Sequence, residues 1–199
     1  MKKASKRIRS LIFPITVLFL VVIVLSYFGI KSRWFRAPFP SFGKKISWVI
    51  DLPEQAYNFD VVVPGKLYRS GRPDERFISY VYKKYGIVHL ISLTGKEKYH
   101  HAAKELGMNV MIYEWSTRHL PTNEELAAVI DFLHKNDHIM VHCAGGSDRT
   151  GYTVAFYRIW RQNWKLEQAI KEMKKYWHQP ERKKALHREI KETFKADGH

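Results

Sequence analysis

The residues with the clearest chemical potential lie in one short stretch, in which Cys143, the only cysteine, stands six residues before Arg149. Residues 144–148 between them are small or flexible, an apolar run at 139–141 precedes them, and a helix is expected from Thr150 onward. A strand, a tight loop and a helix N-terminus form an anion-binding cradle, because loop N–H groups and the helix dipole both favour negative charge. The same field favours an ionised thiol, so we expect a thiolate at Cys143 and a guanidinium that grips a phosphoryl group at Arg149.

Residues 142–151 read HCAGGSDRTG and resemble the phosphate-binding loop of the cysteine-dependent protein tyrosine phosphatases, whose pattern is H-C-x5-R-[ST]-G. A Gly-rich turn around an inert cysteine is the structural alternative, since free cysteines are usually core residues. The resemblance extends over residues 55–195 to bacterial dual-specificity-like tyrosine phosphatases. It rests on a Tyr-Arg-Ser-Gly-x-Pro string at 68–73, a core strand at 86–93 and a helix pair at 151–173.

This resemblance implies roles for individual residues. Cys143 would be the nucleophile and form a cysteinyl-phosphate that water hydrolyses. Arg149 would bind the phosphate and its transition state, and Thr150 would donate its hydroxyl to the sulfur. His142 and Gly151 would order the loop. The phosphate-binding set would be Cys143, Ala144, Gly145, Gly146, Ser147, Asp148 and Arg149, and the reaction needs no cofactor and no metal.

The general acid is the open position of this assignment. Many family members take it from an Asp about thirty residues before the cysteine, but this chain has no Asp between Asp74 and Asp131. Asp148 is one candidate, because an Asp before the loop arginine occurs in some bacterial tyrosine phosphatases and in myotubularin-type lipid phosphatases. Glu114 is the other. The structural alternatives are that Asp148 only braces the loop and that Glu114 is a solvated strand end, which would leave neither as the acid.

Two arginines of the Tyr-Arg-Ser-Gly-x-Pro string, Arg69 and Arg72, are further candidates to face the phosphate. A turn held by Gly71 and Pro73 explains the same string equally well.

The N-terminal residues differ in composition from the rest. A basic tail at 1–10 precedes residues 11–30, which carry no charge and are long enough as a helix to span a bilayer. We expect a single-pass membrane anchor at 11–30, in a bacterial inner membrane, a linker at 31–54 and a phosphatase domain at 55–199. A cleaved signal peptide and a buried core helix are the alternatives. The numbers of Lys and Arg on the two sides of this segment are equal, so they leave its orientation in the membrane open. The denser cluster before it weakly favours an orientation with the catalytic domain outside.

The net charge of +15 predicts anionic partners. Only five of the 34 Lys and Arg lie in the first ten residues, so the remainder is also basic, notably at 171–195. Phosphorylated proteins, phospholipids or inositol phosphates fit this charge, and no sequence motif indicates specific nucleic-acid binding.

Strands alternate with helices along residues 55–199, which predicts an α/β sandwich of the protein-tyrosine-phosphatase kind with a central, largely parallel sheet flanked by helices. Strands are expected at 61–63, 67–68, 88–93, 110–115 and 139–141, and helices at 74–85, 96–106, 122–135, 150–163, 165–176 and 180–195. The helix at 122–135 opens with a capping-box pattern, Thr122 and Glu125. The cradle then lies at the carboxyl end of a central strand, where such sheets bind ligands.

Three functions follow from these features. The first is a membrane-anchored phosphatase acting on phosphotyrosine, or with dual specificity. The second is the same chemistry on a lipid or inositol phosphate. The third is a catalytically inactive phosphate-binding module.

Overall fold

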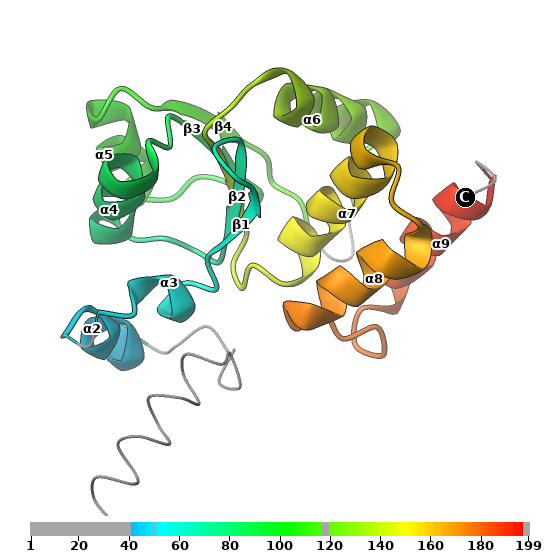
Figure 1. Ribbon diagram of the computed structural model, residues 1–199, viewed down its shortest axis with the longest axis horizontal. Helices are drawn as coiled ribbons and strands as arrows, with labels where there is room; N and C mark the ends of the chain where they lie inside the picture. The colour runs from blue at the N-terminus through cyan, green and yellow to red at the C-terminus, as the bar shows by residue number, and fades with distance from the viewer. Residues whose placement is uncertain (1–40, 50, 117–119, 197–199) are drawn as a thin grey trace, which may run out of the picture. The chain divides into compact units, whose positions relative to one another are not determined.

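The computed structural model describes residues 41–49, 51–116 and 120–196, where a five-stranded sheet lies between two groups of helices (Figure 1). The sheet has the order β1-β2-β5-β3-β4; β1 is antiparallel to β2 and the other pairs are parallel. The strands are β1 (Asp60–Val63), β2 (Leu67–Ser70), β3 (His89–Ser92), β4 (Asn109–Ile112) and β5 (Ile139–His142). The predicted α/β fold with its central, largely parallel sheet is confirmed.

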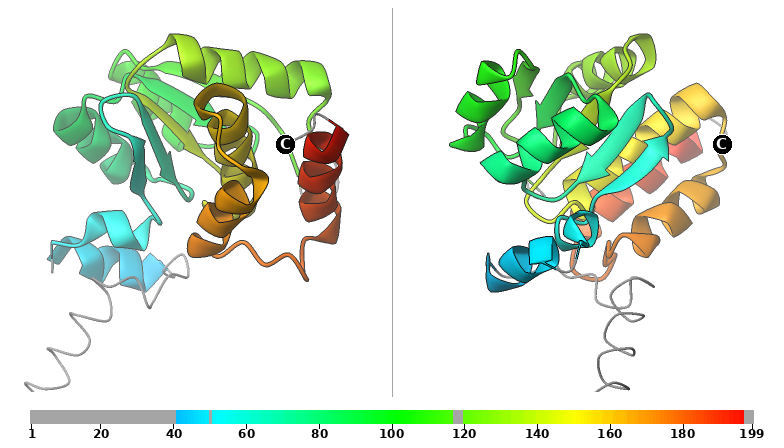
Figure 2. Two further views of the ribbon diagram at one scale, coloured as in Figure 1. Left: turned by 45° about the vertical axis from the view of Figure 1, so that its right-hand side comes forward. Right: turned by 60° about the vertical axis from the view of Figure 1, so that its left-hand side comes forward.

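The helices cover both faces of this sheet, with α4 and α5 on one side and α6 to α9 on the other (Figure 2). The described helices are α2 (Ser41–Val49), α3 (Pro53–Ala56), α4 (Glu75–Tyr85), α5 (Tyr99–Glu105), α6 (Asn123–Lys135), α7 (Asp148–Gln162), α8 (Leu166–Lys175) and α9 (Lys184–Ala196). The capping box predicted at Thr122 and Glu125 is present at the start of α6. It satisfies two N–H groups that the helix itself leaves without a partner.

The central strand β5 divides the interior into two apolar cores, because successive side chains of a strand point to opposite faces. Ile139 and Val141 join the core under α6 to α9, and Cys143, just beyond the strand, lies at its edge. Met140 joins the core under α4 and α5. All four residues of β5 are buried, so the loop that follows them starts from a rigid position.

Three helices begin more than one residue away from the predicted start. The helix expected from residue 96 begins at Tyr99, and the one expected from residue 180 begins at Lys184, after a turn at 179–183. Helix α7 begins at Asp148 rather than at Thr150. This last difference matters for the site, because it places Asp148 and Arg149 in the first helical turn.

The described part of the expected linker 31–54 is largely helical. Trp48 of α2 packs edge-on against Tyr57, Phe77 and Tyr80, and the guanidinium of Arg76 lies 4.1 Å above its ring. Aromatic packing therefore ties α2 to the catalytic fold. The predicted tail 1–10 and anchor 11–30 lie outside the described residues. Within the described ranges, no helix is both long and apolar enough to cross a bilayer.

Candidate active site

The loop between β5 and α7 borders a cavity of about 320 Å³. Its described lining residues are Ser116, Cys143, Ala144, Gly145, Ser147, Asp148, Arg149 and Lys183. Cys143 is a free thiol, 2% exposed, at the carboxyl end of the central strand. The structure thus brings the predicted nucleophile, the predicted arginine and one candidate acid, Asp148, to a single cavity.

Three consecutive carbonyl oxygens of the loop are held from outside it. The donors are the Arg72 N–H to Ala144 at 3.0 Å, Asn58 Nδ2 to Gly145 at 2.9 Å and Arg69 Nη2 to Gly146 at 2.6 Å. In a planar trans peptide the N–H points opposite to the C=O. The contacts therefore turn the N–H groups that follow these carbonyls toward the cavity, as an anion-binding cradle requires.

Gly146 is the loop position at which the surrounding protein leaves no room for a side chain. Its φ is 71°, and a Cβ built there would lie 2.6 Å from the backbone nitrogen of Gly71. A Cβ at Gly145 would meet only Ser147 Oγ at 3.6 Å, and one at Gly151 would be in ordinary contact with Met173. The close approach that glycine permits at 146 is therefore between the loop and the end of β2.

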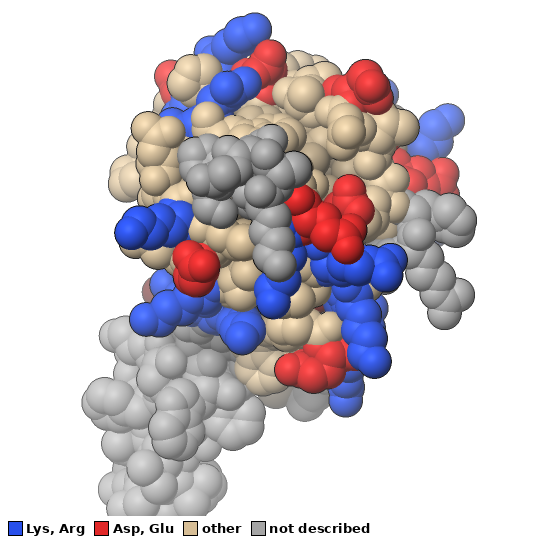
Figure 3. All heavy atoms as spheres, turned by 90° about the vertical axis from the view of Figure 1, so that its right-hand side faces the viewer, with Lys and Arg blue, Asp and Glu red and all other residues tan. Residues whose placement is uncertain are grey.

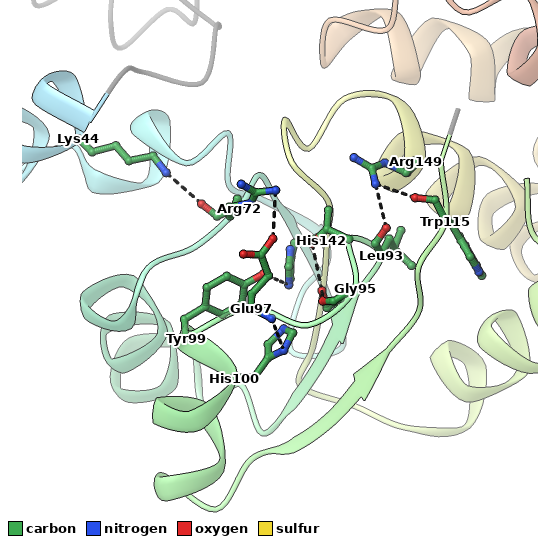
Figure 4. Close-up of polar contacts among 12 residues, drawn as sticks. Lys44, Arg72, Leu93, Gly95, Glu97, Tyr99, His100, Trp115, His142 and Arg149 are labelled. Atoms are coloured by element: carbon green, nitrogen blue, oxygen red, sulfur yellow. Dashed lines mark hydrogen bonds and ion pairs between the residues drawn. The ribbon is translucent and has the colours of Figure 1, made fainter. Parts of the chain in front are cut away.

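Arg149 is fixed by the ends of two neighbouring strands (Figure 4). Its Nη1 donates to the carbonyl of Leu93, just after β3, at 3.0 Å and to that of Trp115, beyond β4, at 2.7 Å. The other guanidinium N–H groups make no hydrogen bond to the described residues. They remain available for the paired oxygens of a phosphoryl group.

His142 lies beneath the loop as a neutral side chain. It is fully buried, with Nε2 3.4 Å from the Tyr99 hydroxyl (Figure 4). Burial, and after it the positive charge of nearby His100, lowers the pKa of His142 to about 3. Near neutral pH this imidazole neither gives nor takes a proton, which suits a residue that orders the loop.

The two candidate acids occupy different places. Asp148 lines the cavity, its side chain is 23% exposed, and its Oδ1 lies 2.9 Å from Nδ1 of His178. Glu114 is exposed beside Gly95, where a Cβ would lie 3.4 Å from its carboxyl carbon, and it is not among the residues that line the cavity. Only Asp148 is in position to reach a substrate in this cavity.

Thr150 is fully buried in the first turn of α7. Its hydroxyl makes no hydrogen bond to Cys143 or to any other described residue. The predicted hydrogen bond from Thr150 to the sulfur is therefore not formed in this structure.

The structure also shows where the two arginines of the Tyr-Arg-Ser-Gly-x-Pro string lie. Arg69 is beneath the loop, not in the cavity, with its guanidinium 3.6 Å from the ring centroid of Tyr176. The guanidinium of Arg72 instead pairs with Glu97 at 3.0 Å (Figure 4).

Sequence reasoning missed Asn58, His178 and Lys183. The last two belong to the turn between α8 and α9, for which the sequence signalled only positive charge. Figure 3 shows the side of the molecule that carries α8 and α9, where Lys and Arg gather over the lower half with fewer acidic side chains among them. Lys183 brings this charge to the cavity itself.

Comparison with known proteins gives a family and a fold. The model of the PTP-SAK family, described as "Swiss Army Knife protein, DSP-PTPase phosphatase domain", matches residues 56–193. TpbA of P. aeruginosa is similar in structure with a TM-score of 0.59 and 20% identity, over 68% of this chain and 84% of TpbA.

Two further solved structures share the fold. The core catalytic domain of the PP-IP phosphatase SIW14 from S. cerevisiae has a TM-score of 0.55 and 24% identity, over 60% of this chain and 75% of that domain. PTPMT1 has a TM-score of 0.53 and 21% identity, over 71% of this chain and 99% of its own. No curated protein matches the sequence significantly. Because the family match covers most of the chain, and the nucleophile and arginine expected of such an enzyme border one cavity, this protein belongs to the PTP-SAK family and is a cysteine-dependent phosphatase.

Proposed function

We propose that this protein is a membrane-anchored phosphomonoesterase that removes phosphate from phosphotyrosine, with phosphoserine and phosphothreonine as further substrates. One observation carries the phosphatase chemistry: Cys143 and Arg149 border the same cavity, and the loop between them has three carbonyls bound on its outer side. An oxyanion in the cavity then meets N–H groups and a guanidinium, with the sulfur placed to attack its phosphorus.

The reaction proceeds in two displacements. In the first, the Cys143 thiolate attacks phosphorus, the bond from phosphorus to the leaving oxygen breaks, and Asp148 gives its proton to that oxygen. In the second, water attacks the cysteinyl-phosphate, its proton passes to the Asp148 carboxylate, and the S–P bond breaks. Inorganic phosphate leaves, and both side chains return to their starting states.

Aryl-phosphate hydrolysis by the full-length protein tests this proposal. Cys143→Ser is expected to abolish turnover, and Arg149→Lys to reduce it strongly, because a lysine cannot supply the paired donors of the guanidinium fork. Turnover that survives Cys143→Ser would overturn the nucleophile assignment. A phosphotyrosine peptide is expected to be hydrolysed faster than its phosphoserine counterpart.

A lipid or inositol phosphate is the second candidate substrate, and Lys183 favours it. The described lining includes this lysine but no aromatic side chain that would flank a phosphotyrosine ring. The structural neighbours also include both substrate classes: TpbA was crystallised with pTyr, SIW14 is a PP-IP phosphatase and PTPMT1 was crystallised with PI(5)P.

Phosphopeptide and phosphoinositide panels separate the two candidates. Lys183→Met is expected to slow hydrolysis of substrates with a second phosphate while leaving aryl-phosphate turnover unchanged. Lys184→Met is the matched control, because Lys184 is exposed and does not line the cavity. Equal turnover of polyphosphorylated substrates by both variants would favour phosphotyrosine.

The anchor is supported by the uncharged stretch 11–30 and the five basic residues before it. The full-length protein is expected to stay in the membrane pellet after alkaline carbonate washing, and a form lacking residues 1–36 to be released. Full-length protein in the soluble fraction would refute the anchor. Protease added to spheroplasts tests the side of the membrane: a catalytic domain outside the membrane is digested, whereas one inside is protected.

A further inference from the structure

The carboxylate of Asp148 is held by a histidine thirty positions away. The ring of His178 is fully buried, and its Nδ1 lies 2.9 Å from Oδ1 of Asp148. His178 is itself fixed, because its backbone N–H donates to the carbonyl of Met173 at the end of α8 and the preceding Trp177 takes a φ of 72°. The turn after α8 thus places Nδ1 of His178 within hydrogen-bonding distance of Asp148, the candidate proton donor.

The surroundings of His178 determine which of its nitrogens carries the proton. The carboxylate that forms when Asp148 gives up its proton only accepts hydrogen bonds, so Nδ1 must be the donor in that state. Nε2 is buried and has no hydrogen-bond partner among the described residues. A proton on Nε2 would add an unpaired buried donor and a buried charge, both of which cost free energy. The ring therefore donates its Nδ1–H to Oδ1 of Asp148.

We propose that His178 is a positioning residue for the proton transfer of Asp148, an inference that rests on the proposed acid role of that carboxyl group. The hydrogen bond occupies Oδ1, so the exchangeable proton is carried by Oδ2. In the first displacement Oδ2 gives this proton to the leaving oxygen, and in the second it takes one from water. His178 keeps its own proton throughout and stabilises the carboxylate that forms as the leaving group departs.

A purely structural role would affect turnover differently. The contact also fastens the turn between α8 and α9 to the start of α7, so its loss could loosen the site as a whole. Such loosening would slow all substrates alike. Loss of an aligned acid slows substrates with a poor leaving group much more than activated ones, because only the former need the proton.

The test compares p-nitrophenyl phosphate with an alkyl phosphate, using the full-length protein in detergent. His178→Phe fills the space but removes the donor, and is expected to reduce kcat about 10- to 100-fold on the alkyl phosphate and less than about threefold on p-nitrophenyl phosphate. His178→Asn places an amide N–H near the position of Nδ1 and is expected to restore most of the loss. The ratio of the alkyl phosphate rate to the p-nitrophenyl phosphate rate is measured on one preparation of each variant, so it does not depend on the fraction of protein that is folded.

His187 supplies the matched control, because its ring lies 5.6 Å from that of His178, measured between centroids, while the hydrogen bond to Asp148 comes from His178. His187→Phe is expected to leave the ratio unchanged. Adding His178→Phe to Asp148→Asn is expected to cause no further change in the ratio, because the two residues act as one unit.

The outcomes separate this inference from the function on which it rests. If Asp148→Asn changes the ratio and His178→Phe does not, the positioning role is refuted while the acid role stands. If Asp148→Asn slows both substrates equally, the acid role itself fails. An Asn variant no better than Phe would also overturn the role of Nδ1–H.

Discussion

Arg69 is a fully buried cation, and the charges of Glu172 and Asp60 offset the cost of its burial only in part. It is 0% exposed, donates from Nη2 to the carbonyl of Gly146 at 2.6 Å and stacks on Tyr176, while Nε and Nη1 have no partner. Burial lowers the pKa of Arg69 to about 10. We predict that Arg69→Met has little effect on the free energy of unfolding but a large effect on catalysis.

The predicted stability change is small because two contributions offset each other. The fall in pKa from 12.5 to about 10 corresponds to about 3 kcal/mol against burying the charged form. Replacing Arg69 with methionine relieves this cost but leaves the Gly146 carbonyl without its donor, which costs about 1–3 kcal/mol in the other direction. Methionine fills a similar volume, so we expect a net change of less than about 2 kcal/mol.

The effect on catalysis is larger because the lost charge acts on the phosphoryl group. At an effective dielectric constant of about 20 and an assumed separation on the order of 10 Å, a unit charge contributes about 1.7 kcal/mol, and a dianion doubles this. The Gly146 carbonyl also loses the donor that holds it. We therefore expect kcat/KM for p-nitrophenyl phosphate to fall about 100-fold.

Arg158 provides the opposite case in the same protein. This nearly buried arginine binds both carboxylate oxygens of Glu172, at 3.1 and 2.8 Å, and the carbonyl of Val62. Arg158→Met leaves a poorly exposed carboxylate without its partner, which is expected to cost about 3–5 kcal/mol. Activity per folded molecule should change little, since Arg158 makes none of the contacts that hold the loop.

Urea unfolding and steady-state kinetics on both variants test the contrast. If Arg69→Met lost more than about 4 kcal/mol and kept its activity, Arg69 would be only structural. If Arg158→Met impaired catalysis more than Arg69→Met, the electrostatic reasoning would be wrong.

Three further predictions concern the site and its surroundings. Gly146→Ala places a methyl group 2.6 Å from the Gly71 nitrogen at a φ of 71°, so activity should fall at least about 100-fold. Gly145→Ala, whose added Cβ meets no such obstruction, should retain most of the activity. Similar kinetics for the two variants would contradict the loop geometry. His142 binds a proton at about 6.5 when unfolded but only near 3 when folded, so the wild type should lose stability as the pH falls from about 6.5 toward 3. His142→Asn should weaken that dependence in urea titrations at pH 7.5 and 5, and parallel curves for the two proteins would refute it. Glu114→Gln should change the turnover of an alkyl phosphate less than about threefold, and a tenfold loss would return the acid role to Glu114.

The sequence by itself determined the local chemistry of the site. The spacing of Cys143 and Arg149, the glycines between them and the apolar run at 139–141 are sufficient to predict a strand, a phosphate-binding loop and a helix. They are sufficient because these elements form from neighbouring residues. The alternation of strands and helices and the capping box of α6 were predictable for the same reason, and both are confirmed. The membrane anchor at 11–30 stays a prediction.

Only the tertiary structure decided what surrounds that loop. Arg69 holds the Gly146 carbonyl because β2 pairs with β5 in a register that sets Arg69 beside Val141, and Asn58, just before β1, holds the Gly145 carbonyl. His178 reaches Asp148 because α8 packs on α7 and its following turn leads back to the cavity. Such contacts join residues 30 to 87 positions apart. Strand register and helix packing set these distances, and both depend on the whole core rather than on any local pattern.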